Sequence, residues 1–171
     1  GIAKKKGLIH TSPYEEFKFK YVPGEREVLD NQELLSLFNL YKTEFINVGG
    51  KTLPLPPDHK EVLRRFLFSC VTGIRLSDTH HITVDNVANN QLTFKVAKGF
   101  YRSAKIQKIP LSTVALKLIE GRKGKLFNKI TDQHINQLLK FIAGWAGISK
   151  VLSFHVSRGT FATQYLRMGG D

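Results

Sequence analysis

Apolar residues recur with helical spacing in two stretches of the first half of the chain. The first stretch follows Asp30, which stands at an N-cap position with Glu33 as its capping-box partner. The second follows Asp58, the expected N-cap, with Glu61 three residues later, and it ends at Gly73. Both patterns predict a helix, and the Gly- and Pro-rich segment NVGGKTLPLPP is predicted to separate the two.

Two further helices are predicted near the end of the chain. Thr131 is the expected cap of the first, whose apolar stripe runs from Ile135 to Ala146 before Gly147 ends it. Ser153 is the expected cap of the second. The predicted inward face of this last helix consists of Phe161, Ala162, Tyr165 and Leu166, and Gly169 and Gly170 mark its end.

Between these helices the apolar period changes to two. The segments ITVDNV, QLTFKVA and AKIQKIPL alternate as strands do, with Asn89 and Asn90 as a turn between the first two and a longer basic loop between the last two. The expected fold class is therefore α+β and mainly α-helical: helices with a small three-stranded antiparallel β-sheet insert.

The composition divides the chain into two parts. Residues 1–29 contain Pro13, Pro23 and Gly24 but no sustained period, which predicts a connector lying across the surface of the main domain. Residues 30–171 carry all the predicted elements, and a chain of 171 residues with 42% hydrophobic residues is sufficient for one main domain.

The charge balance points to a polyanionic partner. The 26 Lys and Arg against 14 Asp and Glu give a net charge of +12, and the basic residues recur in five clusters with little acidic compensation. A single basic cluster is usually only a solvated surface, but five favour nucleic acid binding. A membrane surface is the weaker polyanion hypothesis, because no strongly basic amphipathic helix with a broad aromatic face stands out.

The sequence favours a cytoplasmic protein. It shows neither an apolar run near the ~20 residues of a membrane span nor the apolar core of a secretory signal. Cys70 is the only cysteine and lies on the apolar side of its predicted helix, so it is interpreted as a buried thiol. His80 and His81 lack the accompanying ligands of a metal site, and no metal or cofactor is expected.

Four basic or histidine residues stand where a backbone element ends or turns: Arg75, Lys98, His155 and Arg158. Two arginines can hold the non-bridging oxygens of a phosphodiester during in-line attack, without a metal. Histidine can bond to an oxygen or move a proton, and a lysine with a lowered pKa can protonate the leaving alkoxide. Taken singly, each residue also fits an ordinary role: a salt-bridge arginine, a solvated loop lysine or a helix-start histidine.

Sequence motifs covering nearly everything from residue 30 onward resemble one enzyme family. The segments TGIRLSD, the basic hairpin running into KIPLS, GKLFN and ISKVLSFHVSRGTFAT are similar to the catalytic domain of the tyrosine recombinases, or phage integrases, and are closest to integrases of prophages and conjugative transposons. The resemblance implies a DNA breaking–rejoining fold and a covalent 3′-phosphotyrosine intermediate. It also implies a homotetramer on a duplex attachment site, and a bacterial, nucleoid-associated location.

The resemblance also assigns roles to residues. It implies that Arg75, His155 and Arg158 are catalytic and that Lys98 is the hairpin lysine, although Lys95 and Lys105 remain alternatives for the acid. Contacts to DNA are expected from Lys95, Tyr101, Arg102 and Lys105. Gly159 stands where the family often has His.

The family's nucleophilic tyrosine is expected beyond Asp171, so this chain alone is predicted to be inactive. Tyr165 is interpreted as a core residue because it follows Arg158 by only seven positions on the predicted apolar face. Trp145 is likewise interpreted as core rather than as a base-stacking platform. The alternative function is a non-catalytic DNA-binding accessory module. An RNA-binding protein would need more exposed aromatic residues on the sheet than Phe94.

Overall fold

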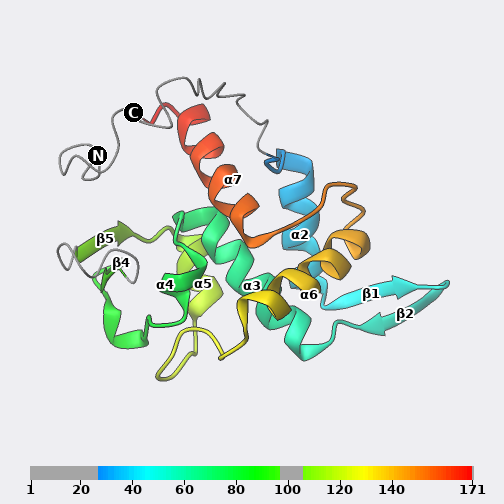
Figure 1. Ribbon diagram of the computed structural model, residues 1–171, viewed down its shortest axis with the longest axis horizontal. Coiled ribbons are helices and arrows are strands. Elements are labelled where there is room, and N and C mark those ends of the chain that lie inside the picture. The colour runs from blue at the N-terminus through cyan, green and yellow to red at the C-terminus, as the bar shows by residue number, and fades with distance from the viewer. Residues whose placement is uncertain (1–26, 97–105, 171) are drawn as a thin grey trace, which may run out of the picture.

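The computed structural model describes residues 27–96 and 106–170, which form a mainly helical domain with two small antiparallel sheets (Figure 1). The helices are α2 (Asn31–Thr43), α3 (Pro57–Thr72), α4 (Leu76–Thr79), α5 (Thr113–Ile119), α6 (Asp132–Trp145) and α7 (Phe154–Arg167), with a short 3-10 helix η1 (Val84–Asn86). The strands are β1 (Phe45–Val48), β2 (Lys51–Pro54), β3 (Val87–Ala88), β4 (Gln91–Lys95) and β5 (Ile106–Pro110). The predicted fold class is confirmed. No helix in the described ranges is long and apolar enough to cross a membrane.

Helix α3 is the centre of the domain and packs against α2, α5, α6 and α7. Most of its apolar side chains are buried, and those of Phe66, Leu67 and Phe68 are completely so. Arg64 and Arg65 are buried too, and both guanidinium groups lie over the ring of Phe127. Because α3 is covered on nearly all sides, it fixes the relative positions of the helices around it.

Two caps and two helix ends follow the sequence prediction. Asp30 accepts a hydrogen bond from the Glu33 amide and Glu33 accepts one from the Asp30 amide, which completes the capping box of α2. Thr131 caps α6 through its side chain. Helix α3 ends at Gly73, with φ of 68°, and the chain turns after α6 at Gly147, with φ of 72°.

The predicted cap of α3 is wrong. Its N-cap is Pro56, without a side-chain bond, and Asp58 lies inside the first turn. Pro57 has the backbone angle that a first helical turn needs, so the chain enters the helix earlier than predicted. Glu61 does not reach back to the cap, because its carboxylate is buried between Arg64 and Arg122 at 2.7 and 2.5 Å.

The segment predicted only to break the helical pattern forms the β1–β2 hairpin, which projects from the body of the domain (Figure 1). Gly49 and Gly50 both have positive φ and make its turn. In the three-stranded sheet, β4 pairs with β3 and β5, and Asn89 and Asn90 form the predicted turn with φ of 50° and 56°. Most of ITVDNV is not a strand: it forms η1, and β3 keeps only two residues.

The predicted inward face of α7 is wrong. Ala162, Tyr165 and Leu166 are exposed, and the buried side chains of the helix are Phe154, Val156, Ser157 and Thr160. Small polar residues take the inward positions because they find partners there. The hydroxyls of Ser157 and Ser69 are 2.7 Å apart, and Thr160 accepts a hydrogen bond from the Leu29 amide at 3.0 Å.

Helix α7 crosses the end of α3 at very short range. A Cβ added at Gly73 would lie 2.6 Å from Cδ1 of Phe161, closer than real side chains approach. Two independent reasons therefore require glycine at this position: its φ is positive, and the ring of Phe161 occupies the space of a side chain.

We predict that Gly73→Ala destabilises the domain by about 2–4 kcal/mol, since it adds a clash to the backbone cost. Gly147→Ala is the matched control, because Gly147 has a similar φ and nothing lies within 4 Å of a Cβ added there. We expect it to lower the free energy of unfolding by only about 1 kcal/mol. Urea unfolding measures both. Equal losses for the two variants would contradict the close crossing.

Candidate active site

Arg75 occupies a backbone position that is fixed from both sides. It is the N-cap residue of α4 in extended conformation, directly after the buried Ile74. The Ser69 hydroxyl donates a hydrogen bond to the Ile74 carbonyl at 2.7 Å, which ties this turn to the last part of α3. The side chain of Arg75 is exposed, so a rigid turn presents a guanidinium group to the surface.

Arg158 reaches the same place from α7. Its Nε donates a hydrogen bond to the Gly73 carbonyl at 3.0 Å, and its side chain is half-buried. Burial, and then the positive charge of Arg75, lower the pKa of Arg158, while the buried Asp78 opposes this shift. The sequence predicted that both arginines belong to one site, and the structure brings them together.

Two hollows in the surface meet at this pair of arginines. One, of about 590 Å³, also holds His155, and the other, of about 460 Å³, is bounded by β5. The first is lined by Arg75, Leu76, Ser77, Asp132, Asn136, Ser153, Phe154, His155 and Arg158. The second is lined by Gly73, Arg75, Val96, Ile106, Gln107, Lys108 and Arg158.

The arrangement is suited to an anion. Two like charges held near each other are unfavourable in the free protein, and a phosphate between them would replace this repulsion by charge-assisted hydrogen bonds. Guanidinium donors match phosphate oxygens well. Arg158 keeps its two terminal NH2 groups for such contacts, because the only hydrogen bond that it donates within the described residues runs from Nε to the Gly73 carbonyl. His155 is exposed on the same helix and three residues before Arg158, so its imidazole shares the hollow.

Of the remaining predicted site residues, the structure describes only one. Lys98, Tyr101, Arg102 and Lys105 lie outside the described residues. Lys95 is exposed at the end of β4, and the following residue, Val96, lines the second hollow.

Sequence reasoning missed the charged side chains of Lys108 and Asp132 and the amide of Asn136, which also line the hollows. Lys108 was visible as a basic residue in a strand pattern, but the pattern does not say which surface a strand faces. Asp132 and Asn136 belong to α6, and nothing in the sequence places that helix beside α7.

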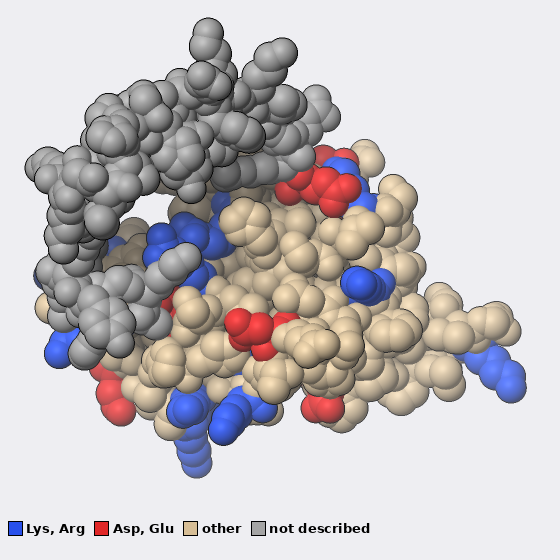
Figure 2. Space-filling model, viewed as in Figure 1, with Lys and Arg blue, Asp and Glu red and all other residues tan. Residues whose placement is uncertain are grey.

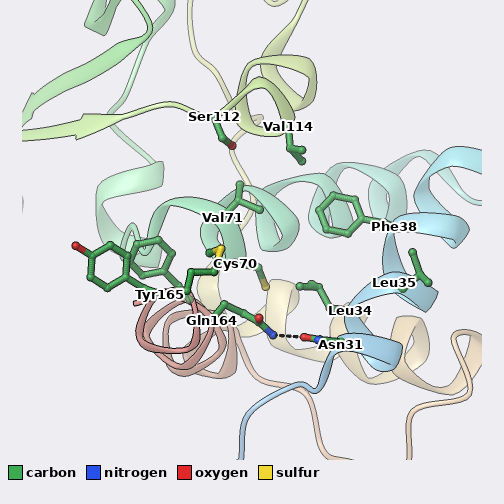
Figure 3. Close-up of a pocket in the computed structure, with 12 residues that line it drawn as sticks. Asn31, Leu34, Leu35, Phe38, Cys70, Val71, Ser112, Val114, Gln164 and Tyr165 are labelled. Atoms are coloured by element: carbon green, nitrogen blue, oxygen red, sulfur yellow. Dashed lines mark hydrogen bonds between the residues drawn. The ribbon is translucent and has the colours of Figure 1, made fainter. Parts of the chain in front are cut away.

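Tyr165 is not a core residue, which corrects the sequence interpretation. It is 47% exposed, stacks on Phe161 and lines a separate apolar hollow of about 410 Å³ between α2, α3 and α7 (Figure 3). Neither arginine of the candidate site lines this hollow. Cys70 lies at its base, and burial raises the pKa of this thiol, as expected for an inert cysteine.

Two other predictions concern aromatic and histidine side chains. Trp145 is half-buried and packs on His59, with ring centroids 4.8 Å apart, which agrees with a packing role. His80 Nε2 lies 2.7 Å from Oδ1 of Asp132, within hydrogen-bond distance. Within residues 27–96 and 106–170, no three His, Cys, Asp or Glu side chains lie close enough together to hold a metal ion.

We predict that sulfate, used as a phosphate mimic, raises the melting temperature by about 2–5 °C over chloride at equal ionic strength. Arg75→Ala should abolish this gain, because one arginine alone holds the anion weakly. Arg167→Ala, an exposed arginine at the end of the same helix, is the control and should keep the gain. Thermal unfolding of the three proteins measures the effect, and an undiminished gain in Arg75→Ala would contradict the anion site.

Comparison with known proteins identifies the fold. No family model and no curated protein sequence matches the chain. Solved structures do match: XerA recombinase has a TM-score of 0.64 at 18% identity, and the catalytic domain of bacteriophage HP1 integrase has 0.58 at 21%. A lambda integrase dimer bound to a COC′ core site has 0.69 at 15%.

These matches cover most of this chain but a smaller part of each matched structure. They cover 90%, 86% and 99% of this chain, but 55%, 76% and 63% of the respective structures. The chain thus spans little more than half of XerA recombinase and about three quarters of the HP1 catalytic domain. At such low identity the similarity concerns the fold. The chain has the fold of the catalytic domains of tyrosine recombinases and integrases.

Proposed function

We propose that this chain is the catalytic domain of a site-specific DNA recombinase or integrase. In the full-length protein it would cut and rejoin DNA through a 3′-phosphotyrosine intermediate. One observation carries the proposal: Arg75 and Arg158, distant in sequence, line the same two hollows, and His155 lines the larger of them, on a fold shared with recombinases. In the proposed domain organisation residues 1–29 are the end of a core-binding domain and the interdomain linker, and residues 30–171 are the catalytic domain.

In the proposed mechanism the arginines stabilise negative charge, and His155 and Lys98 serve in hydrogen bonding and proton transfer. Arg75 and Arg158 hold the non-bridging oxygens of the scissile phosphate, where negative charge grows during in-line attack. His155 bonds to one of these oxygens or accepts the proton of the attacking hydroxyl. Lys98 protonates the departing 5′-oxygen. Lys108 faces the same hollow as the arginines and adds a further contact to the DNA backbone.

Duplex DNA is the proposed partner. The similar structure of the Tn1549 transposon integrase is a complex with circular intermediate DNA, that of lambda integrase is bound to a COC′ core site and that of XerH recombinase to a difH substrate. The net charge of +12 supports a polyanionic partner for this chain as well. Figure 2 shows Lys and Arg at several separate places on one face, including the projecting hairpin. We propose assembly as a homotetramer on the attachment site, in the bacterial cytoplasm at the nucleoid.

The nucleophile is not among the described residues that line the two hollows, because no tyrosine lines either of them. Tyr165 lies in the apolar hollow and is not proposed for this role. That the nucleophile follows Asp171 stays a prediction. This chain is therefore proposed to bind DNA without cutting it, and a non-catalytic DNA-binding module is the alternative function.

We predict that the chain binds duplex DNA with low sequence preference and a strong dependence on salt. With about four to six phosphate contacts, log affinity should fall against log salt with a slope of roughly −4 to −5. Fluorescence anisotropy between low and moderate salt measures the slope. Lys108→Ala should reduce its magnitude by about one, through the loss of one phosphate contact. Binding that salt does not affect would remove the nucleic acid function.

We predict that Lys98→Ala in the full-length protein reduces cleavage of ordinary DNA by about 10²–10⁴-fold, the usual range for loss of an acid catalyst. Cleavage should largely recover on DNA whose bridging 5′-oxygen is replaced by sulfur, because a thiolate leaves without a proton. Single-turnover cleavage of both substrates measures the recovery.

The control variants distinguish the role of an acid catalyst from that of a positive charge on the phosphate. Arg75→Ala and Arg158→Ala should not recover on the sulfur-containing DNA, since their charge is required whichever atom departs. Lys95→Ala and Lys105→Ala test the other candidate acids. Recovery in either lysine variant, with none in Lys98→Ala, would move the acid to that residue. Equal recovery in Arg75→Ala would contradict the proposed arginine role.

A further inference from the structure

The hollow that contains His155 has one side built by α6. Asp132 and Asn136, one helical turn apart, line it opposite the start of α7. Asn136 hydrogen-bonds both to its own helix and to the start of α7, the turn from which His155 extends.

Asn136 caps α7 from a neighbouring helix. Its Oδ1 accepts a hydrogen bond from the Phe154 amide at 2.8 Å, and its Nδ2 donates one to the Asp132 carbonyl at 2.9 Å. The residue in the N-cap position, Ser153, makes no side-chain capping bond. The first amide of α7 is therefore satisfied by a side chain of α6, which joins the two helices at the edge of the hollow.

The position of His155 depends on this first turn. Within the described part of the chain, no hydrogen bond or ion pair holds the imidazole, and the side chain is exposed. The backbone therefore determines where the imidazole lies, and His155 directly follows the capped residue. Arg158, by contrast, is held separately by its bond to the Gly73 carbonyl, and Ser157 by its bond to Ser69.

We propose that Asn136 is a positioning residue, which fixes the first turn of α7 and thereby places the imidazole of His155 against the phosphate. The role in catalysis rests on the proposed function. Loss of the cap frees the turn that carries His155 but leaves the separately anchored Arg158 in place. Removal of Asn136 therefore affects the step that uses the imidazole more than the binding of DNA.

The first test examines the cap without any catalysis. Hydrogen exchange of the Phe154 amide, measured by NMR, should accelerate at least about tenfold in Asn136→Ala, and the ring signals of His155 should shift. Asn136→Asp keeps an oxygen acceptor and should restore the protection. Asn86→Ala is the control, since Asn86 Oδ1 accepts from the Thr83 amide outside the site. Unchanged Phe154 exchange and His155 signals in Asn136→Ala would overturn the proposal.

The second test measures cleavage by the full-length protein. Asn136→Ala should lower single-turnover cleavage about tenfold with DNA affinity within about twofold. In a His155→Ala background, Asn136→Ala should lower the cleavage rate by less than about twofold, because no imidazole remains to be positioned. Equal losses of cleavage rate in the wild-type and His155→Ala backgrounds would mean that Asn136 has a general structural role and would overturn the positioning role. If the wild-type protein cleaves no DNA, the proposed function fails, while the NMR test still decides whether Asn136 positions His155.

Discussion

The candidate site depends on the crossing of α3 and α7 at Gly73. Without a side chain, Gly73 lets the ring of Phe161 press against the chain where α3 ends, and its carbonyl accepts the hydrogen bond from Arg158. Two residues later the same turn presents Arg75. A single backbone position thus fixes the separation of two positive charges that would otherwise repel each other.

Buried polar contacts make this crossing specific. The Ser69 hydroxyl bonds to the Ile74 carbonyl and lies 2.7 Å from the Ser157 hydroxyl, so one side chain links the turn of Arg75 to α7. Apolar packing between two helices tolerates small shifts, whereas a buried hydroxyl pair loses its partner when the helices slide. The arginine pair is consequently held by a rigid framework, which suits the proposed role of stabilising the charge of a phosphate.

Much of this fold follows from local sequence signals, and the errors lie where tertiary contacts prevail. The capping box of α2 and the Asn89–Asn90 turn need only neighbouring residues, and both were predicted. The inward face of α7 was mispredicted because Ser157 and Thr160 are buried through partners on α3 and at Leu29, which no apolar pattern reveals. The resemblance to recombinases identified the arginines, but Asn136 becomes visible only through its contact with α7.

In the proposed site Arg75 and Arg158 hold one phosphate between them. A crystal structure of the full-length protein on a duplex containing its attachment site tests this most directly. We expect one backbone phosphate with oxygens within about 3 Å of both guanidinium groups, and the His155 imidazole beside it. A DNA backbone that passes over another surface, or that meets only one of the two arginines, would contradict it.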